Sequence, residues 1–178
     1  MMDGRQFIEN VTREFSRLKR LADAAAAQVD DEAYFTAPGP QDNSIAVVSK
    51  HMAGNMWSRW RDFLTTDGEK PDRRRDQEFV IEEREIRKAI DALWERGWNT
   101  LFATLESLEP GDLSKTVTIR AESHAVSQAI HRQLTHYAYH VGQIVYLSRH
   151  FAGEHWVSLS LPKGESETFN QNPGKYQS

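Results

Sequence analysis

Apolar residues recur every three or four positions along four long stretches of the chain, which is the spacing of amphipathic helices. The pattern predicts helices over residues 4–29, 44–66, 81–108 and 123–151, with Asn43 or Ser44 as the N-cap of the second. Four such helices with almost no strand signal indicate an all-α four-helix bundle. The length of 178 residues fits a single domain spanning 1–178.

Shorter signals refine this picture. Asp3 and Gln6 resemble a capping box, and Gly97 within the third helix predicts close packing of another helix. Residues 116–119 alternate with β-branched side chains, which predicts a short strand-like element before the last helix. The chain after residue 151 turns polar and is expected to form an extended C-terminal tail. The polar segment 67–78 is predicted to be a surface loop.

Composition excludes several classes of function. The net charge of -4, with both signs mixed along the chain, argues against a general nucleic-acid-binding protein. The basic run at 73–75 is flanked by acidic residues, so we interpret it as a solvated loop or local salt bridges rather than as an anion site. The absence of cysteine excludes disulfides, iron–sulfur clusters and a cysteine nucleophile. Without a signal peptide or a membrane-length apolar run, a cytoplasmic protein with no membrane partner is expected.

Histidines supply the candidate chemistry. His136 and His140 lie four residues apart on a predicted helix, so both side chains fall on one face and can reach one metal ion. Gln143 lies on the same face, within reach of such a site or of its surroundings. Two partly buried, hydrogen-bonded histidines are the alternative that this spacing leaves open.

His51 lies on the second predicted helix, one residue from its apolar stripe and one turn from Asn55. A lone histidine there is more often a core or boundary residue than a ligand. It completes a three-histidine site only if the second and fourth helices are neighbours, which periodicity does not show. Arg59 and Arg120 could bind an anionic substrate, although surface arginines more often form local ion pairs.

Two motifs support a family resemblance. Residues 51–56 read His-Met-Ala-Gly-Asn-Met, and residues 136–144 read His-Tyr-Ala-Tyr-His-Val-Gly-Gln-Ile. Together with the segments 65–71, 118–120 and 159–166, they resemble the DinB-like (damage-inducible) metalloprotein superfamily, most closely a bacterial subfamily of unknown function. The resemblance covers nearly the whole chain, and the superfamily includes thiol S-transferases.

The resemblance implies an up-down-down-up bundle and a divalent metal held by one histidine of the second helix and two of the fourth. Carried over residue by residue, the ligands are His51, His136 and His140, with Gln143 and Asn55 as supporting residues around them. It also implies a homodimer, which the wide apolar arc of the last helix favours as well.

Three neutral imidazoles leave an open position on the ion, as in catalytic rather than structural sites, and suit zinc or nickel. The first interpretation is a metal-dependent transferase, in which a low-molecular-weight thiol attacks an electrophile. A metal-dependent hydrolase ranks second, because the sequence shows no HExxH motif and no other glutamate beside the ligands. The third interpretation is a non-catalytic metal-binding or stress-related bundle protein.

Overall fold

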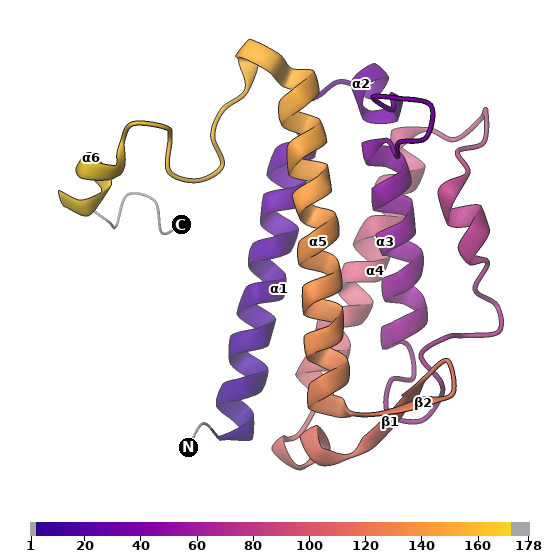
Figure 1. The fold of residues 1–178 in the computed structure, drawn as a ribbon. Helices are drawn as coiled ribbons and strands as arrows, with labels where there is room; N and C mark the ends of the chain where they lie inside the picture. The colour runs from indigo at the N-terminus through magenta and orange to yellow at the C-terminus, as the bar shows by residue number, and fades with distance from the viewer. Residues whose placement is uncertain (1–2, 172–178) are drawn as a thin grey trace.

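Four long helices lie side by side in the computed structural model, which describes residues 3–171 (Figure 1). They confirm the mainly helical fold class. The long helices are α1 (Gly4–Ala26), α3 (Ile45–Trp60), α4 (Arg87–Ser107) and α5 (Val126–Ala152). The shorter elements are α2 (Asp31–Phe35), η1 (Arg75–Phe79), η2 (Pro110–Ser114), β1 (Thr116–Ile119), β2 (Glu122–Ala125), η3 (Gly153–His155) and α6 (Ser166–Gln171).

The core lies between α1, α3, α4 and α5. Helix α3 packs on both α4 and α5, and α1 packs on α5. Aromatic rings fill the centre, where Phe15 contacts Trp60 and Tyr137 at ring-centroid distances of 5.8 and 5.9 Å. A Cβ at Gly97 would lie 3.1 Å from the carbonyl oxygen of Ala53, which confirms the predicted close approach of two helices there.

Several predicted helix ends are wrong. The first helix ends at Ala26 rather than at residue 29, and α4 begins at Arg87 rather than at residue 81. Ser44 caps α3 as predicted, but α3 ends at Trp60 instead of continuing to residue 66. The physical reason is that the chain folds back over α3: the Ser58 hydroxyl donates to the Gly68 carbonyl and accepts from the Lys70 amide. The short helix α2 was not predicted.

A β-hairpin joins α4 to α5. The predicted strand is confirmed as β1, and it pairs antiparallel with β2. Residues 123–125 of β2 were wrongly assigned to the start of the last helix. The two turn residues, Arg120 and Ala121, have positive φ values of 56° and 61°, as a type I′ turn requires. The Asp67 carboxylate accepts hydrogen bonds from both of their amides at 2.8 Å. Asp67 thereby fixes the hairpin to the segment that follows α3.

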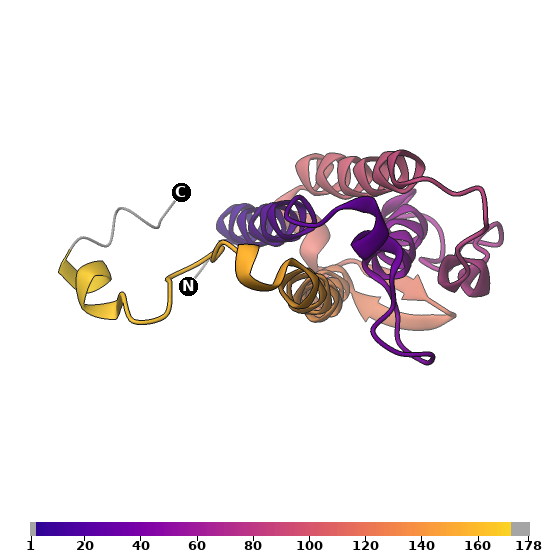
Figure 2. The same ribbon diagram turned by 90° about the horizontal axis from the view of Figure 1, so that it is seen from above.

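The chain after α5 leaves the helices. Gly153 turns it with a φ of 55°, and α6 lies apart from the four long helices in both views (Figures 1 and 2). This agrees with the expected extended tail, of which residues 172–178 lie outside the described part, as do Met1 and Met2. Within residues 3–171, every helix is too short or too polar to cross a lipid bilayer.

Candidate metal centre

Three histidines from two helices come together on one side of the core. His51 lies on α3, while His136 and His140 lie one turn apart on α5. Each offers a ring nitrogen, and these three atoms lie within 4.8 Å of one another. The neighbouring packing of α3 and α5, which periodicity could not show, therefore brings His51 to the pair. Together the three side chains could hold a metal ion.

Hydrogen bonds orient two of the three rings. Nδ1 of His51 lies 2.9 Å from Oε2 of Glu78, and Nδ1 of His140 lies 2.8 Å from Oε1 of Gln143. Both oxygens are acceptors, so Nδ1 is the donor in each of these hydrogen bonds. Metal-ligating histidines are usually oriented in this way. Gln143 therefore orients the ring of His140, as Glu78 orients that of His51.

Glu78 was missed by the sequence reasoning, which placed it in a solvated loop and found no glutamate near the ligands. Its carboxylate is buried and accepts from Nε and a terminal nitrogen of Arg73, both at 2.8 Å, in addition to His51. Arg73 is buried as well, with 3% of its side chain exposed. The interpretation as local salt bridges is thus correct for Arg73, whereas the prediction of a surface loop is wrong for both residues.

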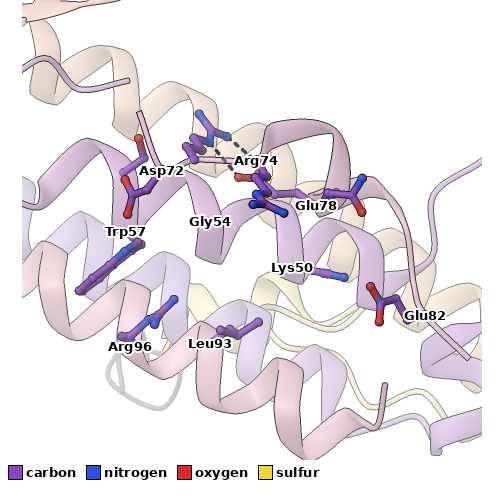
Figure 3. A pocket seen from close by; sticks show the side chains of 12 residues that line it. Lys50, Gly54, Trp57, Asp72, Arg74, Glu78, Glu82, Leu93 and Arg96 are labelled. Carbon is purple, nitrogen blue, oxygen red and sulfur yellow. Dashed lines mark hydrogen bonds and ion pairs between the residues drawn. The ribbon is translucent and has the colours of Figure 1, made fainter. Parts of the chain in front are cut away.

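Gly54 on α3 makes room for Glu78. A Cβ at this position would lie 2.7 Å from the carboxyl carbon of Glu78, closer than real contacts allow. Figure 3 shows Glu78 beside Gly54, at the wall of a cavity between α3, α4 and the segment 72–82. None of the three histidines lines that cavity. The Gly54 in the first motif was the only available signal that something packs against this turn of α3.

The environment keeps the histidine pair neutral. Burial, with the neighbouring His140 and His51, lowers the pKa of His136 from 6.5 to about 3. Burial also lowers the pKa of His140, although its bond to Gln143 acts in the opposite direction. Burial alone would raise the pKa of Glu78, but its bonds to Arg73 and His51 bring it below its usual value. The two neutral imidazoles of His136 and His140, with the His51 ring that Glu78 holds, form a suitable donor set for a cation.

Asn55 contacts a tyrosine rather than a histidine. Its side-chain oxygen accepts from the Tyr137 hydroxyl at 3.0 Å, and that hydroxyl accepts from Nε1 of Trp60 at 3.1 Å. Tyr137 is fully buried, and burial raises its pKa, so it stays protonated. This chain of bonds fixes the turn of α5 between His136 and His140 against α3.

The spacing of the nitrogens fits a bound ion. Nε2 of His136 and Nε2 of His140 lie 3.0 Å apart. Zinc–nitrogen bonds of about 2.0–2.1 Å in tetrahedral geometry place two ligand nitrogens about 3.3 Å apart. For this pair, a shift of a few tenths of an ångström separates the observed spacing from a chelating one, whereas the three ligand atoms together are within 4.8 Å of one another. His131, in contrast, is exposed on another face of α5 and contacts the ring of Phe7.

Comparison with known proteins gives a family but no activity. Residues 3–165 match the family described as "Protein of unknown function (DUF1572)". This match covers most of the chain, including all three histidines, the hairpin and the segment that carries Glu78. No curated protein matches the sequence.

Proposed function

Since the chain belongs to the DUF1572 family, whose description leaves the activity open, we propose a function from the site itself. The protein binds one divalent transition-metal ion, zinc or nickel, through His51, His136 and His140, and acts as a transferase of a low-molecular-weight thiol. The relation to the DinB-like superfamily, the up-down-down-up course and the homodimer belong to the same proposal. The side-by-side arrangement of α1, α3, α4 and α5 supports that course (Figure 1).

One observation carries the metal site: three ring nitrogens from two helices converge within 4.8 Å, and two of the rings are held by outer acceptors. A bound divalent ion would lower the pKa of a thiol or water that coordinates it. The chain itself contributes the orientation of its imidazoles and the exclusion of water on the side of Tyr137. It has no cysteine, so the sulfur must come from a substrate.

Glu78 bears on the choice between transferase and hydrolase. A hydrolase needs a group that can accept a proton from water near the ion. Both Glu78 oxygens already accept hydrogen bonds, one from Arg73 alone and the other from Arg73 and His51. Such a carboxylate serves to orient His51 rather than to act as a base, so we keep hydrolysis, and a non-catalytic metal protein, as the alternatives.

Metal analysis and a thiol titration test the proposal. The purified protein should carry close to one zinc or nickel per chain, and His136→Ala or His140→Ala should lose most of it, whereas His131→Ala should keep it. The cobalt-loaded protein should develop a sulfur-to-cobalt charge-transfer band with the correct thiol, and this thiol should react with an electrophile in a metal-dependent assay. Full occupancy in a variant lacking all three histidines would refute the site. Ester cleavage without any thiol transfer would favour the hydrolase.

A further inference from the structure

The cavity beside the histidines is lined by arginines. It has a volume of about 440 Å³, and both His51 and His136 open into it. None of the described residues that line it is acidic. Its cationic side chains come from α3, the segment before α4, the hairpin turn and α5, and they are Arg59, Arg73, Arg75, Arg120 and Arg132.

Too few carboxylates lie close enough to neutralise these five cations. Glu69 accepts from Arg59, Arg73 and Arg120 at 2.9, 3.2 and 3.1 Å, so one carboxylate serves three arginines. Glu78 pairs with Arg73 alone among them. Behind the cavity, two negative charges thus face three positive ones.

Arg75 and Arg132 are the least compensated of the set. Their nearest carboxylates, on Asp76 and Glu122, lie 3.8 and 3.9 Å away and are 98% and 71% exposed. Water and salt screen such exposed pairs strongly. The guanidinium groups of Arg75 and Arg132 are about half exposed. One terminal nitrogen of Arg132 lies 3.1 Å from Nε2 of His124, and its other donors, like those of Arg75, keep their capacity to bind an anion.

Ring contacts place Arg75 close to His51, one of the three candidate metal-binding histidines. Its guanidinium lies 5.0 Å from the ring centre of Phe79, and the Phe79 ring lies 4.7 Å from that of His51. Arg132 reaches the cavity from α5, the helix that carries His136. A molecule between the two arginines would thus lie next to the histidines.

Two buried polar atoms at the cavity lack partners. Nε of Arg59 and Oε1 of Gln133 have no hydrogen-bond partner within the described part of the chain, although both residues are at least nine-tenths buried. Buried polar atoms in folded proteins nearly always find a partner. Arg59 and Gln133 both line this cavity, so its wall contains two polar groups whose hydrogen bonds are incomplete.

From these observations we propose that the cavity binds a small anionic molecule through a carboxylate or phosphate group. Arg75 and Arg132 hold the anion with planar, charge-assisted hydrogen bonds, and its remaining part reaches His51 and His136. The role as substrate rests on the proposed function, but anion binding by the arginines does not require the metal.

Calorimetric titration of the full-length protein tests this, both as purified and after treatment with a chelator. The probes are inorganic phosphate and malonate at low ionic strength, and at least one of them should bind in both forms. The double variant Arg75→Gln/Arg132→Gln should lose about tenfold or more in affinity. Arg149→Gln, an exposed arginine on the same helix as Arg132, should lose none. Circular dichroism melting confirms that each variant is folded.

The outcomes separate this proposal from the metal site. His140→Ala should still bind the anion after chelation, even if it no longer binds metal. Binding of only one probe identifies carboxylate or phosphate as the recognised group. The proposal is overturned if neither anion binds, or if the double variant binds as tightly as the unchanged protein. An equal loss in Arg149→Gln would show nonspecific charge attraction and would overturn it as well.

Discussion

Replacing Glu78 with glutamine tests whether this carboxylate supports both the fold and the histidine site. Glu78 accepts three hydrogen bonds, two from Arg73 and one from His51, and the side chains of Glu78 and Arg73 are 8% and 3% exposed. Glutamine keeps the shape but loses the charge, and its amide nitrogen must face a donor. At least one buried N–H of Arg73 or His51 then loses its acceptor.

The expected loss of unfolding free energy depends on the ion pairs that Arg73 keeps in the Glu78→Gln variant. Breaking a buried ion pair by removing one partner costs about 3–5 kcal/mol. Arg73 still has Glu69 at 3.2 Å, so we expect the lower end, about 3 kcal/mol of unfolding free energy. Loss of a partner that orients a metal-ligating histidine typically costs about 10–100-fold in metal affinity, and the same is expected here if His51 binds metal.

Urea denaturation measures the first effect, and competition with a chelator of known affinity measures the second. Asp76→Asn is the matched control, because Asp76 lies on the same short helix with 98% of its side chain exposed. The control should change stability by no more than about 0.5 kcal/mol. If Glu78→Gln behaves like Asp76→Asn in both assays, the assignment of Glu78 as a buried supporting residue is wrong.

Three further predictions concern the hairpin and the core. Ala121→Gly should raise the unfolding free energy by about 1 kcal/mol in urea denaturation, because Ala121 has a φ of 61°; a destabilised variant would contradict this. Burial would raise the pKa of Asp67, but backbone amides lower it from 3.8 to about 2. The ionised Asp67 carboxylate should thus add to the unfolding free energy above about pH 4, and this contribution should be lost as the pH falls toward 2. The unfolding free energy of Asp67→Asn, measured over the same pH range, should lack this pH-dependent loss. Tyr137→Phe should cost about 1–3 kcal/mol in thermal or urea melts, since Asn55 and Trp60 lose a buried partner; an unchanged midpoint would contradict that reading.

Periodicity predicted the four long helices because each buries one continuous apolar stripe. It could not predict where α3 ends. That end depends on hydrogen bonds of the Ser58 side chain with Gly68 and Lys70, which the chain brings back over α3 after leaving the helix. Two histidines on one face of α5 were visible from spacing alone. Their meeting with His51 depends on which helices are neighbours, and only the family resemblance indicated that.

The segment after α3 was misread because its composition is polar. Polarity usually marks a solvated loop, but Arg73 pairs with both Glu69 and Glu78, so the side chains of Arg73 and Glu78 can be buried. The contact of Glu78 with His51 joins residues 27 positions apart, and no local pattern encodes it. Gly54 was the one signal in the sequence, because a glycine within a helix can indicate that another group packs closely there, but it does not identify that group as Glu78.

The fold places part of the cavity wall outside the two helices that carry the three histidines. The three histidines lie on the rigid helices α3 and α5, whereas Arg75 and Arg120 lie on η1 and on the hairpin turn. Exchanges within short connecting segments are tolerated more easily than changes within packed helices. If the proposed anion site is correct, replacements near residues 75 and 120 would alter which anion binds and would leave the positions of the three histidines on α3 and α5 unchanged.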